Sequence, residues 1–311
     1  MSLVQQLRGC VRACDWAACS SKSVFSRMWG GERRDWQIDH NRYCSERCFE
    51  QAMHKEIARL LHAPAAKAAA VRHRVPLGLI LLSRGVLSEG QLRDVLAAKV
   101  ETAHGRFGEL AVQLGFATEQ DVITALGAQW GTPVLSAETC CSARLPWLPL
   151  RLLERHRALP VHLSRERQLY VAFADGISHE LLRAIERIEG CTTNACLVGG
   201  SVWKHALLDW ERERVTDSEV VFEVPQPGAA IAGTICSYVH QWRASRVRLA
   251  KCGEYMWARL DRPSATFTLL MRHSEPERNV AGSTHNSADR KAPLRTPSIF
   301  FVLSRGRDSR T

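Results

Sequence analysis

The sequence predicts an α+β protein in which a four-helix tandem-repeat unit is followed by a small α/β domain. Three observations lead to this fold class. One 24-residue pattern occurs twice between Pro76 and Gln129, strand and helix patterns alternate over residues 136–213, and five of the eleven cysteines lie within the first 48 residues. The cysteines predict an N-terminal zinc finger, and a short helix with strands near the other end predicts a C-terminal small α+β segment.

Composition and pattern shifts divide the 311 residues into the following segments. We expect a zinc-finger-like cysteine module at 1–62, a linker at 63–75, the tandem helical repeat at 76–135, a small α/β subdomain at 136–213, a linker at 214–233, a small α+β segment at 234–272 and a disordered basic tail at 273–311. No apolar run approaches the ~20 residues of a membrane span, and the start lacks the apolar stretch of a secretory signal. We therefore expect a cytoplasmic protein without a membrane span.

The N-terminal module carries two close cysteine pairs, Cys14-x4-Cys19 and Cys44-x3-Cys48. Zinc takes four ligands in a tetrahedron, and two such pairs brought together can supply them. The string YCSERCFEQA places the second pair at the start of a helix, an arrangement that resembles treble-clef and FCS-like bacterial zinc fingers. We predict structural Zn²⁺ on these four thiolates. Unligated cysteines are the alternative, and Cys10 and His40 are spare candidates for replacing Cys14 or Cys19.

Each copy of the repeat predicts a helix, a turn and a second helix. The first copy is PLGLILLSRGVLSEGQLRDVLAAK (76–99) and the second is RFGELAVQLGFATEQDVITALGAQ (106–129). The first helix of each copy ends at a glycine, Gly85 or Gly115, which suits the left-handed residue after a helix. The second helix begins after Ser88 or Thr118, both good N-cap residues. Two such hairpins predict a compact four-helix unit.

A glycine also opens the first helix of each copy, at Gly78 and Gly108. Glycine inside a helix costs about 1 kcal/mol relative to alanine, so a reason for it is needed. We expect some group to approach the helix backbone closely at these two positions.

The later part of the chain alternates strands and helices. Up to residue 213 we predict the helices Leu150–Arg157, Ile177–Glu189 and Ser201–Glu213 and the strands Ala158–Leu163, Gln168–Ala174 and Cys191–Val198. Beyond it we predict the helix Thr234–Ala244 and the strands Val220–Val224, Arg246–Lys251, Tyr255–Leu260 and Phe267–Met271. Asp175 falls between a strand and a helix, and we interpret it as a turn or N-cap aspartate.

Residues 76–210 resemble the N-terminal domain of the secretion and pilus ATPases of the GspE, PilB and MshE type (MshEN-like). The resemblance rests on the tandem LG-x-x-L … L-x-x-Q units and on the segments RALPV and QLYVAFADG, which follow in the family's order. The ATPase domain is expected to be missing. The glycine-rich stretch Gly199–His205 lacks the spacing of a P-loop, and too few residues follow 210 to hold the motor.

In the MshE subgroup the repeat binds cyclic-di-GMP, one motif for each half of the ligand. The resemblance therefore implies a set of nucleotide-binding residues. These are Arg106, Phe107, Gly108, Leu110, Gly115 and Gln129 in the second copy and Leu77, Gly78 and Leu82 in the first. The first copy departs from the family pattern, because Pro76 stands where the second copy has arginine and Lys99 where it has glutamine.

Nothing in the sequence resembles a paired-carboxylate or triad site, so we expect no enzyme. We predict a bacterial regulatory or adaptor protein that binds cyclic-di-GMP and docks to a secretion, pilus or signalling protein. A ligand-independent protein-interaction adaptor is the alternative. A zinc-finger nucleic-acid-binding protein has the least support. The net charge of +10 fits acidic or nucleic partners no better than it fits general surface charge.

Overall fold

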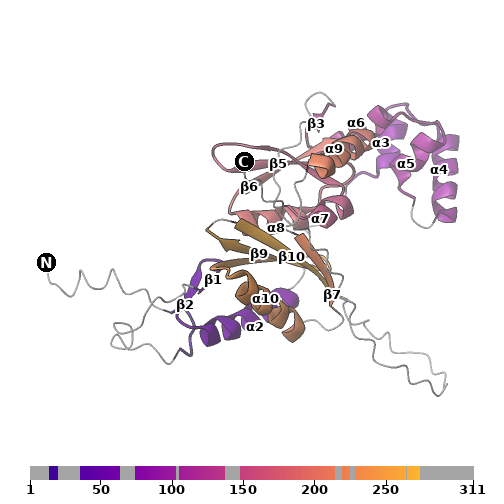
Figure 1. Cartoon of the computed structure of the whole chain (residues 1–311). Helices are drawn as coiled ribbons and strands as arrows, with labels where there is room; N and C mark the ends of the chain where they lie inside the picture. Colours follow the sequence, from indigo (N-terminus) through magenta and orange to yellow (C-terminus); the bar gives the residue numbers. More distant parts are fainter. Residues whose placement is uncertain are drawn as a thin grey trace, which may run out of the picture. The chain divides into compact units, whose positions relative to one another are not determined.

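The computed structural model describes residues 14–19, 36–63, 74–102, 105–136, 148–213, 219–224, 228–263 and 265–273. Over these ranges the chain forms two mixed sheets with helices packed on them, which confirms the predicted α+β class (Figure 1). Cys10 and the tail beyond residue 273 lie outside the described residues. Among the helices in these ranges, none is both long and apolar enough to cross a bilayer.

The repeat forms four helices, at the positions that its turn residues indicate. They are α3 (Leu77–Ser83), α4 (Glu89–Glu101), α5 (Phe107–Gln113) and α6 (Glu119–Trp130). Gly85 and Gly115 have φ angles of 70° and 71°, the left-handed conformation predicted for them. Ser88 and Thr118 each complete a capping box with the third residue of the following helix. Local turn chemistry therefore sets the boundaries of both hairpins.

The two copies are intertwined, because α3 packs mainly on α6 and α5 mainly on α4. The glycines make this packing possible. A Cβ at Gly78 would lie 2.7 Å from Leu92 Cδ1 and 2.9 Å from Phe107 Cζ, and one at Gly108 would lie 2.6 Å from Val122 Cγ1. The group that approaches each helix backbone is thus a side chain of the repeat itself. Each copy completes the core of the other.

The α/β subdomain follows. Its elements are β3 (Val134–Leu135), α7 (Leu150–Arg155), β4 (Ala158–Leu163), β5 (Gln168–Phe173), α8 (His179–Glu189), β6 (Thr192–Val198) and α9 (Gly200–Glu213). The strand order is β3-β6-β5-β4, with β3 and β5 parallel to β6 and β4 antiparallel to β5. Helix α8 returns the chain from β5 to the parallel strand β6. Its apolar face, which includes Leu181, Ile185 and Ile188, is buried with Val171 and Phe173 of β5.

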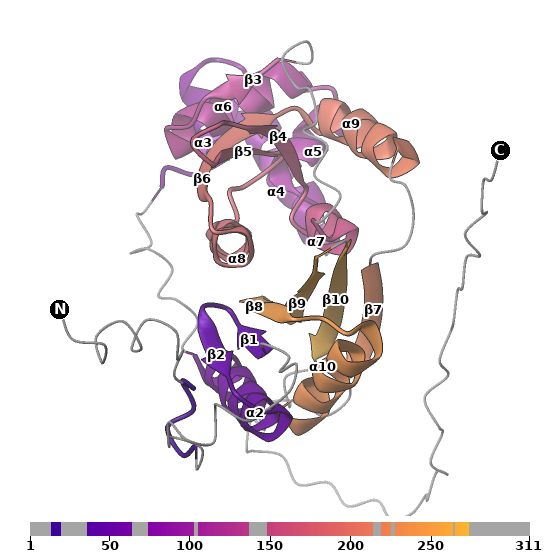
Figure 2. The same cartoon turned by 60° about the vertical axis from the view of Figure 1, so that its left-hand side comes forward.

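The second sheet has six strands in the order β2-β1-β8-β9-β10-β7. They are β1 (Trp36–Ile38), β2 (Asn41–Tyr43), β7 (Glu219–Val224), β8 (Arg246–Cys252), β9 (Tyr255–Arg262) and β10 (Ala265–His273), joined by α2 (Glu46–His62) and α10 (Ala229–Trp242). Strand β1 pairs in parallel with β8, Ile38 opposite Val247. Helices α2 and α10 lie side by side (Figure 2). The cysteine module and the C-terminal α+β segment, which the sequence predicts as separate units, therefore share one sheet and one core.

Helix α8 also contacts the six-stranded sheet. Trp257 and Leu270 of that sheet are buried in the same cluster as the apolar face of α8. Arg187 on α8 is paired with Asp39 at 2.7 Å and with Glu56 at 2.6 Å. The α/β subdomain is thus tied to the N-terminal segment through one helix.

Candidate functional site

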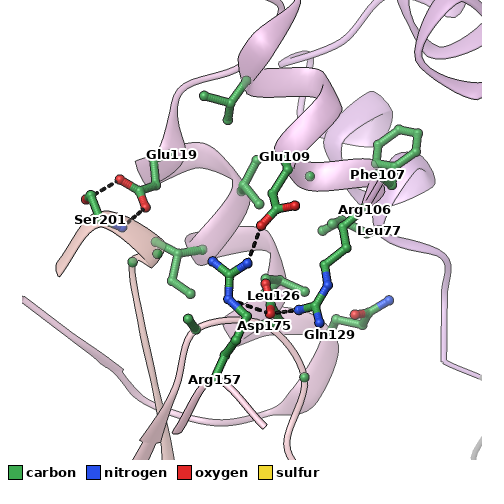
Figure 3. A pocket seen from close by; sticks show the side chains of 18 of the residues that line it. Leu77, Arg106, Phe107, Glu109, Glu119, Leu126, Gln129, Arg157, Asp175 and Ser201 are labelled. Atoms are coloured by element: carbon green, nitrogen blue, oxygen red, sulfur yellow. Dashed lines mark hydrogen bonds and ion pairs between the residues drawn. The ribbon is translucent and has the colours of Figure 1, made fainter. Parts of the chain in front are cut away.

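A cavity of about 610 Å³ lies where the second repeat copy meets the α/β subdomain. Its walls come from the start of α5, from α6, from the residues after β5 and from the start of α9 (Figure 3). Sites for small ligands commonly measure ~300–1,000 Å³. The volume therefore suits a ligand of nucleotide size.

Part of the predicted nucleotide-binding set lines this cavity. The lining residues of that set are Leu77, Arg106, Phe107, Gly108 and Gln129. The rest lie elsewhere: Leu110 is buried against Val95 and Ala111, Gly78 packs against Leu92 and Phe107, Gly115 is the left-handed residue after α5, and Leu82 is half-buried on α3. Of the first copy, Leu77 alone reaches the cavity among the described residues.

Two arginines meet at one carboxylate in the cavity. Arg106 forms an ion pair with Asp175 Oδ2, and Arg157 Nε lies 3.0 Å from the same oxygen. Arg157 is also paired with Glu109 on α5. Figure 3 shows Asp175 between the two guanidinium groups. The arrangement brings together one arginine from the repeat and one from the segment between α7 and β4.

Arg157 is held in place by several contacts. Its φ angle is 45°, which is uncommon for a residue with a side chain. The guanidinium lies 5.1 Å from the ring centre of Trp203, and Trp203 Nε1 donates a hydrogen bond to the carbonyl of Ala158 at 3.2 Å. A residue kept in a sparsely populated backbone conformation is a reason to look for function at that position.

The start of α9 forms another wall of the cavity. The Ser201 N–H donates to Glu119 Oε1 at 2.6 Å, and the Ser201 hydroxyl also bonds the Glu119 carboxylate. A Cβ at Gly200 would lie 3.0 Å from Arg157 Nη2 and 3.2 Å from Glu119 Oε1. Lys204, about one turn further along α9, lines the same space. The glycine-rich stretch Gly199–Ser201 thus forms the start of α9 beside polar side chains of the cavity. Its glycines are not spaced as in a P-loop.

Gln129 ties the end of the second copy to the residue that precedes the first copy. Its Nε2 donates to the carbonyl of Val75, just before α3, at 2.7 Å. The neighbouring Trp130 is covered by the guanidinium of Arg74, 3.4 Å from its ring centre, and a Cβ at Gly176 would lie 3.1 Å from the ring. The indole of Trp130 is therefore in close contact with other protein groups.

Sequence reasoning missed most of the polar wall opposite the repeat. The sequence predicts a turn or N-cap aspartate at Asp175 and indicates no role for Arg157, Glu109, Glu119 or Lys204. One signal was available, because Asp175 follows the carboxyl end of a strand in a parallel pair, where ligands commonly bind in α/β sheets. Arg157 carries no comparable signal, since it reaches the cavity only through the fold.

The four predicted zinc ligands come together as a second candidate site. The Sγ atoms of Cys14, Cys19, Cys44 and Cys48 all lie within 4.8 Å of one another, with 3.5 Å between Cys19 and Cys44 and 4.0 Å between Cys44 and Cys48. A tetrahedral zinc with Zn–S bonds of about 2.3 Å would place its sulfurs about 3.8 Å apart. Both the donor set and its spacing therefore fit zinc. His40 is exposed in the turn between β1 and β2 and is outside this cluster.

The fold brings these cysteines together from two segments. Cys44 directly follows β2, and Cys48 lies in the first turn of α2, where its N–H donates to the N-cap hydroxyl of Ser45 at 3.3 Å. Burial raises the pKa of Cys44 to about 12, and the neighbouring thiols of Cys19 and Cys14 add to the effect. Burial also raises the pKa of Cys48. Thiols that resist ionisation in this way release protons when a cation binds them.

Comparison with known proteins finds similarity over part of this chain. No protein-family model matches it, and no curated protein matches it. A solved structure of MshE with cdg is 24% identical, covers 44% of this chain and 99% of that one, and has a TM-score of 0.38. A structure of the N-terminal domain of XpsE is 21% identical, covers 43% of this chain and 92% of that one, and has a TM-score of 0.36. The chain is thus similar to these domains over less than half of its length.

Proposed function

We propose that this chain is a non-enzymatic regulatory or adaptor protein whose cavity binds cyclic-di-GMP. One observation carries the proposal. Arg106, Gly108 and Gln129, the second-copy residues to which the sequence resemblance assigns nucleotide contacts, line one cavity of about 610 Å³ together with Asp175. The protein would report the ligand to a secretion, pilus or signalling partner.

The polar groups of the cavity suit guanine. Guanine presents the acceptors O6 and N7 on one edge and an N2 amino donor on another, and arginine bonds O6 and N7 bidentately. Arg106 supplies such a fork, while Asp175, Glu109 and Glu119 supply carboxylates that accept from an amino group. Adenine presents a donor in place of O6, so the same wall would discriminate against it.

The charges in the cavity are balanced before a ligand enters. Its cationic side chains are Arg106, Arg157 and Lys204, and its acidic ones are Glu109, Glu119 and Asp175. Both arginines already contact carboxylates, so a phosphate group must exchange with an internal ion pair. Exchange of one charge-assisted contact for another gives a smaller net gain than filling an open cationic site.

The test is calorimetric titration of the full chain with cyclic-di-GMP. We expect saturable binding with a Kd on the order of tens of micromolar or tighter. Arg106→Ala should weaken binding about tenfold or more, since it removes a charged donor. The control is Arg93→Ala, which removes the same charge from α4 at a side chain that is 77% exposed. No binding in this range, or equal binding by the Arg106→Ala variant, would show that the cavity is not a cyclic-di-GMP site.

We also propose that the four-cysteine cluster holds one structural zinc ion. The mutual spacing of the four Sγ atoms and the position of Cys48 in the first turn of α2 support it. Metal analysis of the purified full chain should find about one zinc per chain, and Cys44→Ser should lower that content and destabilise the fold. A content well below one zinc per chain, with the native fold intact, would refute the site.

A ligand-independent docking module is the second candidate. Leu96 and Val100, one turn apart on α4, are 48% and 86% exposed, and a contiguous exposed apolar patch can mark a protein contact. This candidate predicts a partner whose affinity is the same with and without cyclic-di-GMP and falls in a Leu96→Ser, Val100→Ser double variant. A partner that binds only in the presence of the nucleotide would exclude it.

A further inference from the structure

The repeat alone offers one arginine for a ligand that has two equivalent halves. The second copy begins with Arg106, while Pro76 occupies the corresponding position in the first. The cavity nevertheless contains a second guanidinium, that of Arg157, which lies outside the repeat between α7 and β4. Both arginines contact Oδ2 of Asp175, so one carboxylate oxygen separates the two groups.

We infer that Arg157 is the second anion-binding residue of this cavity and replaces the arginine that the first repeat copy lacks. The inference rests on the proposed function and makes it more specific. Arg106 would contact one half of the cyclic dinucleotide, and Arg157 would contact a phosphodiester of the other half. The site is then shared between the repeat and the α/β subdomain.

Arg157 has the features of a preorganised binding residue. Its guanidinium lies 5.1 Å from the ring centre of Trp203 and close to the backbone of Gly200, where a Cβ would come 3.0 Å from Nη2. Glu109 fixes a further edge of the fork, and the side chain is 24% exposed. A guanidinium already held in one orientation loses little freedom when it binds an anion.

The internal carboxylate marks where a ligand oxygen would lie. Asp175 Oδ2 forms ion pairs with two guanidinium groups, and a phosphodiester oxygen carries the same kind of negative charge and also prefers guanidinium donors. Lys204 also lines the cavity and is its third cationic side chain, after Arg106 and Arg157. Displacement of Asp175 by a phosphodiester would leave Arg157 with an anionic partner, while Arg106 would contact the other half of the ligand.

The same contacts also fit a purely structural role, in which Arg157 holds α5 to the α/β subdomain through Glu109. The two roles differ in what they change. A structural arginine affects stability and leaves the affinity for the ligand alone once the chain is folded. A binding arginine affects affinity and its dependence on salt, because the contact is ionic.

The backbone conformation of Arg157 determines which substitutions can be used to test its role. Arg157→Gly removes the side chain and tolerates the φ angle of 45°, whereas alanine would be strained there. Arg157→Lys keeps the charge and removes the planar fork. Arg151→Ala is the matched control, because it removes the same charge from the neighbouring helix α7 at a side chain that is 65% exposed.

The experiment is calorimetric titration of the full chain and these variants with cyclic-di-GMP at low and high salt, with thermal melting as a check of folding. We expect Arg157→Gly to weaken binding about 10–100-fold and to reduce the salt dependence, Arg157→Lys to recover part of the loss, and Arg151→Ala to stay within about twofold. If Arg157→Gly does not fold, Arg157→Lys decides by the same measure. Binding that falls in Arg106→Ala and is unchanged in the folded Arg157 variants would overturn this inference and leave the proposed function standing. A wild-type chain that binds no cyclic-di-GMP would overturn both.

Discussion

The two copies of the repeat have the same backbone plan and different polar ends. Both place a left-handed glycine after the first helix, both start the second helix with a capping box, and both pack a glycine under a neighbouring side chain. The second copy brings its arginine and its glutamine to the cavity, while the first contributes Leu77 among the described residues. Helix packing therefore depends on the glycines of the repeat motif, whereas lining of the cavity depends on its terminal arginine and glutamine.

The glycines show this separation most clearly. Gly78 and Gly108 are explained by close packing in both copies, so they persist whether or not a copy faces a ligand. The arginine has no packing role that both copies share, and it is present only where the cavity lies. A motif can therefore keep its fold after one copy has lost its polar ends.

The largest expected effect tests the shared packing. Gly78→Ala and Gly108→Ala should each lower the free energy of unfolding by about 1–3 kcal/mol, because each new Cβ would overlap a neighbouring side chain. Urea denaturation measures this. Gly90→Ala on α4 is the control, since no atom lies closer than 3.9 Å to its Cβ, and we expect it to be neutral or stabilising. A cost in one copy and none in the other would break the equivalence of their packing.

The helix caps should show the same equivalence at a smaller scale. Ser88→Ala and Thr118→Ala each remove an N-cap side chain that accepts from the third residue of the next helix. Each should cost about 1 kcal/mol in the same denaturation experiment. Costs that differ by more than about that amount would mean that one hairpin depends on its cap and the other does not.

Binding should separate the copies where stability does not. Gln129→Ala removes a side-chain amide at the cavity and should weaken cyclic-di-GMP binding about 2–10-fold, the value of one hydrogen bond. Lys99→Ala, at the matching position of the first copy, should change the Kd less than about twofold, since Lys99 is exposed and outside the cavity lining. Equal losses in both variants would mean that the first copy also binds the ligand.

The smallest expected effect is a difference in acid sensitivity. Hydrogen bonds from the side chain and the backbone of Thr118 lower the pKa of Asp121 below its ordinary value of 3.8, while the first copy has the uncharged Gln91 in this place. The stabilisation by Asp121 is fully present above that ordinary value and is lost as the pH falls through the lowered pKa. Asp121→Asn should therefore flatten the acid limb of the stability curve slightly. A Gln91→Glu variant should introduce a similar limb, and an unchanged curve in both would contradict the argument.

The sequence predicted those structural features that depend on residues close together in the chain, and it missed those that depend on distant residues. Gly85, Gly115, Ser88 and Thr118 act through their own turns, so the helices of the repeat could be placed to within a residue or two. The strands Trp36–Ile38 and Asn41–Tyr43 were not predicted, because three residues carry no periodicity and β1 pairs with β8 from the other end of the chain.

In the candidate site, too, local features could be predicted from the sequence and tertiary contacts could not. Arg106 and Gln129 could be named from the motif they share with a family, whereas Arg157 and Asp175 meet them only through tertiary contacts. The close approach predicted at Gly78 and Gly108 is present, and the approaching groups are side chains of the repeat itself. Leu110 and Gly115 stabilise the fold of the second copy, Leu110 in its core and Gly115 as the left-handed residue after α5. Neither residue lines the cavity.

Amide hydrogen exchange of the full chain, with and without saturating cyclic-di-GMP, tests the central claim most directly. The second copy and the α/β wall should gain protection over residues 106–113, 119–130 and 174–176, while residues 89–101 of the first copy should stay unchanged. This pattern would place the ligand in the cavity between the second copy and the subdomain. Equal protection of both copies, or bound ligand with no change in 106–113 and 119–130, would contradict the account.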